Sequence, residues 1–405
     1  MNELNNLSQF SVSSTRPRCT RFVRDLAQRM LAGELTFVLP KGRRLMLIGE
    51  KPGPAVTVEI RRFRAFWRTI AGGELGFAES FMDGEWSASD LVALMELALT
   101  TKAGFEWLAK IYTSIDLINR HHSQQRPNTR AGAAANIAYH YDLGNAFYAE
   151  WLDKTMTYSS ALFTRPHLSL AEAQDEKYRR IAKILDLRPD DRVLDIGCGW
   201  GGFTEYAARE IGCHVTGITL SNEQANYARE RLMREGLGER ADIRLQDYRD
   251  VQGSYDKIVS IEMFEAVGEE YWPLYFNVLR ERLAPGGRAI LQVIIIAENL
   301  FERYRRRIDF IQRYVFPGGV LPSQKALVSA VNKAGLELKD SFFFGASYAT
   351  TLQQWRSRFQ NSWNDIAQQG FDERFFRMWT YYLSYCEAGF RMQFVDVGQF
   401  LIARS

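Results

Sequence analysis

The second half of the chain alternates short apolar runs with longer amphipathic stretches. Apolar runs of this length predict strands buried on both faces, and the stretches between them predict covering helices. Five strands are predicted in this half, at residues 193–196, 213–218, 242–245, 257–261 and 288–295. Two of the helices are predicted at 203–211 and 271–283, and two last strands, antiparallel, at 336–344 and 395–403. The pattern is typical of a doubly wound α/β domain.

The N-terminal part has a different pattern, with short strand-like runs divided by Pro-Lys-Gly and Lys-Pro-Gly turn signals. Strands are predicted at 35–39, 44–48 and 55–60, and helices at 21–31, 61–71 and 91–99. Residues 1–18 resemble a loose, Ser-rich arm. The polar and then small stretch RHHSQQRPNTRAGAAA predicts a linker at 120–136, where two histidines are better read as solvated than as metal ligands. The sequence therefore predicts an α+β domain at 1–119 and an α/β domain at 137–405.

A glycine-rich turn follows the first strand of the larger domain. Gly197, Gly199 and Gly201 allow a tight turn and a close approach of backbone to a ligand, and the next helix presents its N-terminus there. The third glycine comes too early for the dinucleotide fingerprint, and Thr219 stands near the position of the ribose-binding acid. With Asp195, the turn resembles the first motif of S-adenosylmethionine (SAM) dependent methyltransferases.

Composition narrows the function classes. The net charge is only +3, which disfavours a dedicated nucleic-acid binder. Four cysteines and five histidines show no metal-ligand spacing, so we expect no metal site and reduced, cytoplasmic thiols. No signal peptide or spanning segment is evident, so a cytoplasmic protein, peripheral to the inner face of a membrane, is expected.

Two arginine-rich stretches with aromatic residues are candidates for lipid contact. The first has Arg61, Arg62, Arg64 and Arg68 near Phe63, Phe66 and Trp67. The second has Arg303, Arg305, Arg306 and Arg307 beside Tyr304. Alternatively, these arginines are solvated or pair with acids such as Glu302 and Asp309, and the aromatic side chains pack on the strands.

Several motifs read together in one order. They are HYDLGN (140–145), YSSA (158–161), DIGCGWGG (195–202), GITLSNEQ (217–224), QDYRD (246–250), FEAVG (264–268), YVFPGG (314–319) and YYLSYCEAGF (381–390). Over residues 137 to 403 the chain resembles the cyclopropane fatty acid synthases and mycolic acid methyltransferases. The resemblance implies a seven-stranded, Rossmann-like SAM methyltransferase domain. It also implies methyl transfer from SAM to the cis double bond of a phospholipid acyl chain.

The resemblance assigns cofactor and catalytic residues. SAM contacts are expected at Tyr158, Ser159, Asp195, Gly197, Gly199, Gly201, Thr219, Leu220, Gln224, Asp247 and Ile261. In the family a bound bicarbonate takes the proton, held by a Cys, a Glu, a His, a backbone group and a Tyr. Glu265, Tyr348 and Ile294 match three of these, whereas Ser160 and Gln292 replace the Cys and the His. Ser and Gln can still hydrogen-bond an oxyanion, so bicarbonate is expected as a second cofactor.

The expected product is a cyclopropane acyl chain, formed from an unsaturated phospholipid at the membrane surface. The alternatives are a methyl-branched or methylene chain made by the same transfer, a methyltransferase of a small soluble acceptor, and a lipid-binding protein without activity. The last has no use for the glycine turn, and a small acceptor needs neither the N-terminal domain nor the aromatic insert at 298–317. A homodimer is a further expectation.

Overall fold

The computed structural model describes residues 32–100, 128–141 and 143–404. The chain divides into two compact units, Met1–Thr113 and Ser114–Ser405. The expected arm, the helix at 21–31 and the boundary after residue 119 lie outside the described residues. Within the described ranges, no helix combines the length and the apolar character needed to cross a membrane.

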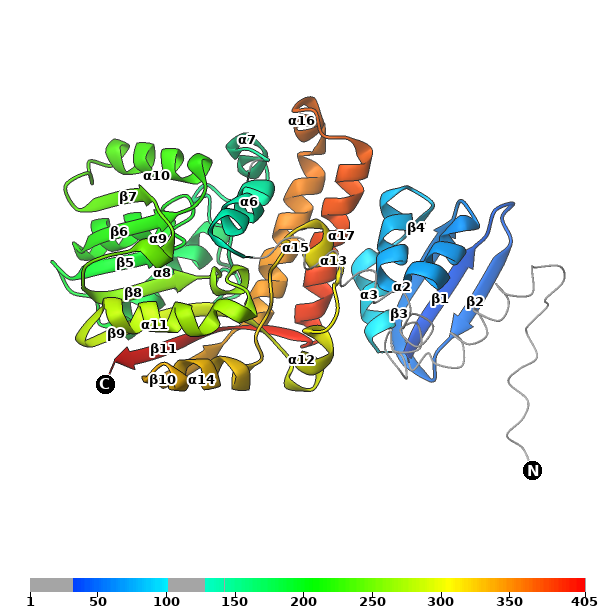
Figure 1. Ribbon diagram of the computed structural model, residues 1–405. Helices are drawn as coiled ribbons and strands as arrows, with labels where there is room; N and C mark the ends of the chain where they lie inside the picture. The colour runs from blue at the N-terminus through cyan, green and yellow to red at the C-terminus, as the bar shows by residue number, and fades with distance from the viewer. Residues whose placement is uncertain (1–31, 101–127, 142, 405) are drawn as a thin grey trace. The chain divides into compact units, whose positions relative to one another are not determined.

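The first unit contains a four-stranded sheet with the order β2-β1-β3-β4 (Figure 1). Its strands are β1 (Ala32–Val38), β2 (Arg44–Ile48), β3 (Lys51–Ile60) and β4 (Trp86–Ala88). Helices α2 (Arg64–Met82) and α3 (Leu91–Leu99) contact these strands. The three predicted strands and both predicted helices are confirmed, but α2 continues well beyond residue 71. It bends at Gly73, whose φ of 56° is left-handed and suits glycine.

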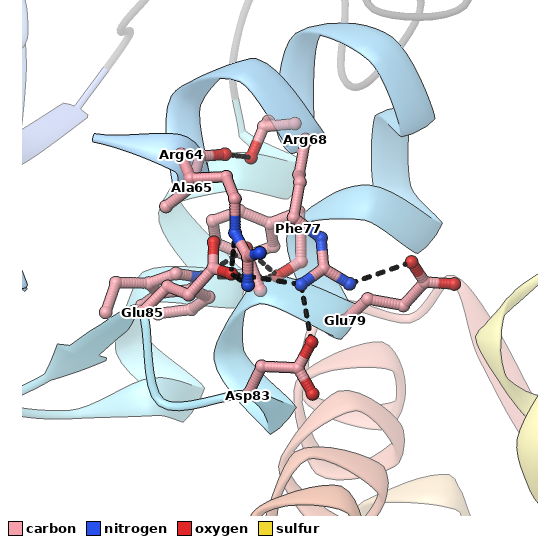
Figure 2. Close-up of polar contacts among 10 residues, drawn as sticks. Arg64, Ala65, Arg68, Phe77, Glu79, Asp83 and Glu85 are labelled. Carbon is pink, nitrogen blue, oxygen red and sulfur yellow. Dashed lines mark hydrogen bonds and ion pairs between the residues drawn. The ribbon is translucent and has the colours of Figure 1, made fainter. Parts of the chain in front are cut away.

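An ion-pair cluster holds the two ends of α2 together (Figure 2). The Arg68 guanidinium lies 3.1 Å from Glu79, 2.5 Å from Asp83 and 3.1 Å from Glu85. Arg64 also donates from Nε to the fully buried Glu85, over 2.7 Å. The expectation that Arg64 and Arg68 offer free charge to lipid is therefore wrong, because acids close by in the fold neutralise both.

The aromatic residues near the first arginine stretch, and the arginines of the second stretch, are also partly buried or paired with acids. Phe66 is buried, whereas Phe63 is 44% exposed. Arg305 pairs with Glu269 and Glu302, and Arg306 with Glu302. For these arginines the alternative reading, pairing with acids, is confirmed.

The second unit contains a seven-stranded sheet with the order β10-β11-β9-β8-β5-β6-β7 (Figure 1). The strands are β5 (Arg192–Ile196), β6 (His214–Thr219), β7 (Ala241–Leu245), β8 (Tyr255–Ile261), β9 (Leu283–Ile296), β10 (Leu336–Phe343) and β11 (Val395–Arg404). The first five are parallel, and β11 lies antiparallel between β9 and β10. All seven predicted strands, and the predicted α/β class, are confirmed.

Helices cover both faces because successive residues of the central strands point to opposite sides. Leu194 and Ile258 join a core with α11 (Trp272–Arg282) and α14 (Gln324–Lys333). Val193 and Val259 join a second core with α8 (Leu170–Leu185), α9 (Gly202–Tyr206), its π-helical continuation η1 (Ala207–Ile211) and α10 (Asn222–Arg234).

The remaining elements surround the edge of the sheet where the parallel strands end. Helices α15 (Gly345–Asn361) and α17 (Glu373–Arg391) pack side by side, joined by α16 (Trp363–Gln368) (Figure 1). The insert after β9 forms α12 (Glu298–Tyr304) and α13 (Phe310–Tyr314). Short helical turns occupy η2 (Tyr248–Asp250), η3 (Phe264–Ala266) and η4 (Glu269–Tyr271). Helix α6 (Arg130–Tyr141) lies before α7 (Asn145–Ala149), so the last residues of the predicted linker are helical.

Candidate active site

The glycine turn joins β5 to α9 at the carboxyl edge of the sheet. The amides of Gly197 and Cys198 both donate to the Ile218 carbonyl, over 2.9 and 3.0 Å, which ties the turn to β6. All three predicted glycines have positive φ, between 56° and 81°. A Cβ at Gly197 would come 2.7 Å from Met263, whereas a Cβ at Gly199 would face open space. The turn therefore leaves room beside Gly199 for a ligand.

The predicted polar contacts for SAM lie around this turn. Asp195 is buried and accepts from Thr204 over 2.8 Å, and its burial raises the pKa of the carboxyl to about 7. Thr219, at the end of β6, donates to Gln224 over 2.7 Å. Both residues flank Leu220 in the β6–α10 connection. These residues fit a nucleoside cofactor with polar hydroxyl and carboxylate groups.

Asp247 is less free than the sequence suggested. Its two carboxylate oxygens accept from Arg249, over 2.8 Å and 2.6 Å, and the pair is buried. The carboxylate keeps lone pairs that could accept from an adenine amino group. The adenine contact stays a prediction.

We expect Gly199→Val to weaken SAM binding by at least about tenfold, close to 1.4 kcal/mol. A β-branched residue is strained at a φ of 56°, and its side chain would enter the open space beside the turn. Calorimetry with the folded variant measures the affinity. Gly236→Val is the matched control, because Gly236 has a φ of 68° and open surroundings at the end of α10. Equal affinities in the two variants would contradict the SAM site.

Tyr158 and Ser159 lie in the connection before α8. The Tyr158 hydroxyl is 2.7 Å from that of Tyr382 on α17, and its ring lies 5.3 Å from Trp355 and 5.4 Å from Trp151. Ser159 accepts from the buried Lys177, over 2.6 Å. Burial lowers the pKa of this lysine to about 7, against the attraction of Glu262. An aromatic wall and an ionisable amine thus stand near the predicted cofactor residues.

The residue that sequence reasoning missed is Glu262, directly after β8. Its Oε1 accepts from the Ser160 amide over 2.8 Å and from the Gln292 side chain over 2.7 Å. Its Oε2 accepts from the Tyr348 hydroxyl over 2.6 Å. Three of the predicted anion-binding residues therefore converge, but on a carboxylate of the chain. The only sequence signal was an acid at the carboxyl end of a buried strand.

Gln292 is oriented by a row of side-chain hydrogen bonds. Arg180 on α8 donates to Gln399 over 3.0 Å, and Gln399 donates to Gln292 over 3.0 Å. Gln292 then donates to Glu262. The strand register supports this row, since Gln292 of β9 is paired with Ile261 of β8 and with Gln399 of β11. We call it the Arg180–Glu262 row.

Glu265 lies one helical turn further on, in η3. Its Oε1 accepts from the Ile294 amide over 2.6 Å, and its Oε2 is buried with no hydrogen-bond partner. Burial and the neighbouring Glu262 raise the pKa of Glu265 to about 8, which favours its protonated form. Glu262 and Glu265 therefore differ in their number of donors.

The bicarbonate implied by the resemblance does not fit these residues. The Ser160 amide, the Gln292 amide and the Tyr348 hydroxyl are bonded to Glu262, and the Ile294 amide is bonded to Glu265. The Ser160 hydroxyl donates elsewhere, to the Ala161 carbonyl over 3.0 Å. A second anion would find these donors occupied and two carboxyl groups beside it.

Comparisons with known proteins show what this chain is similar to. The family described as mycolic acid cyclopropane synthetase matches residues 128–400. The tuberculostearic acid methyltransferase UfaA1 of Mycobacterium tuberculosis is 40% identical over 82% of this chain and 79% of its own length. The cyclopropane-fatty-acyl-phospholipid synthase of Escherichia coli K12 is 37% identical over 84% of this chain and 85% of its own length.

A solved structure extends the likeness to three dimensions. The mycolic acid cyclopropane synthase CmaA1, complexed with SAH and CTAB, superposes with a TM-score of 0.64 at 29% identity. The match covers 67% of this chain and 98% of that chain. SAH is the demethylated form of SAM, in agreement with the cofactor predicted from the glycine turn. The chain therefore belongs to the mycolic acid cyclopropane synthetase family of SAM-dependent methyltransferases.

Proposed function

We propose that this enzyme transfers the methyl group of SAM to the cis double bond of an unsaturated phospholipid acyl chain and forms a cyclopropane. The observation that carries the proposal is the position of the glycine turn and of the two carboxyl groups. The turn follows β5, the carboxyl groups of Glu262 and Glu265 follow β8, and these two parallel strands are adjacent. The relative from E. coli, similar over most of its length, is named for this reaction on phospholipids.

The chemistry of an alkene explains the surroundings of these carboxyl groups. Bound SAM supplies an electrophilic methyl carbon. An alkene is a weak nucleophile, so methyl transfer leaves a carbocation on the acyl chain. Aromatic faces stabilise a cation without bonding to it. Tyr158, Trp355 and Tyr348 provide such faces, with ring centres 5.3 Å (Tyr158–Trp355) and 6.1 Å (Tyr348–Trp355) apart.

A methyl-branched or methylene product is the second candidate. The similarity to the tuberculostearic acid methyltransferase, which is 40% identical to this chain, supports this candidate. Both reactions share the transfer step and differ in how the cation is resolved. Docking on a membrane surface, and a homodimer, also belong to this proposal. In the first arginine-rich stretch, the exposed Arg62 and Phe63 would take part in such a contact.

The test supplies SAM with a carbon-13 methyl group to the full-length enzyme and vesicles of unsaturated phospholipid. We expect the label in the acyl chain as a ring methylene carbon, which NMR distinguishes from a branch methyl and from an alkene carbon. A branch or alkene signal would select the second candidate. A soluble amine or alcohol acceptor, supplied in parallel, should stay unlabelled. Label in that acceptor alone would contradict the proposal.

A further inference from the structure

Three of the residues expected to hold a separate anion, Ser160, Gln292 and Tyr348, donate to Glu262 instead. Resting on the proposed function, we infer that the Glu262 carboxylate takes the place of the bound bicarbonate and is the base that removes the proton after methyl transfer. The reaction of this enzyme then needs no added anion. Glu262 is thus a catalytic residue, and Ser160, Gln292 and Tyr348 position it.

Hydrogen bonding supports the role. An ionised carboxylate has about four lone-pair sites. Three of these sites are used: Ser160 and Gln292 each donate to Oε1, and Tyr348 donates to Oε2. One lone pair of Oε2 is therefore open for a proton. Glu265 has a single donor, at Oε1, and is less suited to carry a negative charge.

The backbone at Glu262 gives independent support. Its φ is +51°, a left-handed conformation that is uncommon for a residue other than glycine and that is often found at functional sites. The Glu262 amide donates to the Gln292 carbonyl over 2.8 Å, which holds this conformation. A glycine would adopt it without strain, so a long acidic side chain at this point requires a reason beyond folding.

The charged and titratable groups that face Glu262 are Lys177 from α8, Glu265 from η3 and Tyr348 from α15. Burial raises the pKa of Glu262, while the Tyr348 hydrogen bond, Lys177, Gln292 and Ser160 oppose this rise. Glu265, with one donor and a raised pKa, competes less for the negative charge. The surroundings therefore favour one anion, on Glu262.

The step balances without another reactant. A C–H bond of the newly transferred methyl group breaks, and the proton passes to Glu262 Oε2. The electron pair of that bond forms the last carbon–carbon bond of the ring and neutralises the carbocation. Glu262 becomes a neutral acid and loses its proton to solvent before the next turnover.

The experiment compares three proteins in buffer freed of bicarbonate: the parent, Glu262→Gly and Glu262→Gln. We expect the parent to keep its full methylation rate and both variants to lose at least about 100-fold, as for loss of a general base. Added formate or bicarbonate should restore Glu262→Gly by roughly tenfold or more, because the missing side chain leaves a space lined with donors. Glu262→Gln should stay inactive, since its amide fills that space.

Two binding measurements do not depend on activity. Calorimetry should show the same SAM affinity for all three proteins, and a bicarbonate complex for Glu262→Gly alone. Glu281→Gln, at the surface end of α11, controls for loss of an acid. Bicarbonate binding by the parent, or a parent rate that requires bicarbonate, would overturn the inference. A full rate in Glu262→Gln would also overturn it. An inactive parent that still binds no bicarbonate would instead count against the proposed function.

Discussion

Tyr348→Phe is expected to lower the methylation rate at neutral pH by about 100-fold while SAM affinity is kept. The phenol is buried, and its hydroxyl is the donor to Glu262 Oε2, at 2.6 Å. Without it, the carboxylate is less well stabilised as an anion and less well positioned. The loss therefore falls on kcat and not on cofactor binding.

The pH profile gives the sign of this effect. The Tyr348 hydrogen bond lowers the pKa of Glu262, so its removal raises that pKa. The base is active when ionised, so the acid limb of the rate profile should move to higher pH, and the variant should partly recover there. Tyr206→Phe, on α9, is the control. A profile with an unmoved acid limb would show that Tyr348 does not act on the base.

Arg68→Met is expected to lower the free energy of unfolding of the first unit by about 3 kcal/mol. Arg68 bridges Glu79, Asp83 and the fully buried Glu85 (Figure 2), and its removal leaves Arg64 as the remaining cation bonded to Glu85. The methionine side chain replaces most of the packing of the arginine stem. The loss of unfolding free energy therefore measures the contribution of the Arg68 charge.

Urea unfolding of the full chain, monitored through hydrogen exchange of the backbone amides in α2 and β4, measures this free energy. Arg61→Met is the matched control, because Arg61 lies 3.7 Å from Glu59 with both side chains about half exposed. Such surface pairs contribute less than about 1 kcal/mol. Equal losses of unfolding free energy in the two variants would show that the ion-pair cluster stabilises the unit no more than an exposed surface pair does.

The sheet could be predicted because its signal is local. Runs such as residues 293–296 are apolar at successive positions, which only a strand covered on both faces requires. The helix over the end of the predicted linker also has a local cause, because RAGAAAN is rich in alanine, the best helix former.

The polar clusters could not be predicted, since they depend on residues far apart in sequence. Arg64 and Arg68 resemble free charges until the fold, with its bend at Gly73, brings Glu79 and Asp83 to Arg68 and Glu85 to both arginines. Glu262 gains its meaning only when the fold brings Ser160, Gln292 and Tyr348 to it. Its acid neighbour, Glu265, belongs to the FEAVG motif of the family, whereas Glu262 lies outside that motif.

The Arg180–Glu262 row has a direction. Each amide in it receives on oxygen from the side of the cation and donates from nitrogen toward the anion. Turning Gln292 around would place its oxygen against Glu262, and Gln399 would then have to turn as well. The two opposite charges thus fix both amides in one orientation, and the bonds polarise one another along the row. Arg180, whose guanidinium carbon lies 3.9 Å from the centre of the Phe342 ring, is therefore coupled electrostatically to Glu262 through two side-chain amides.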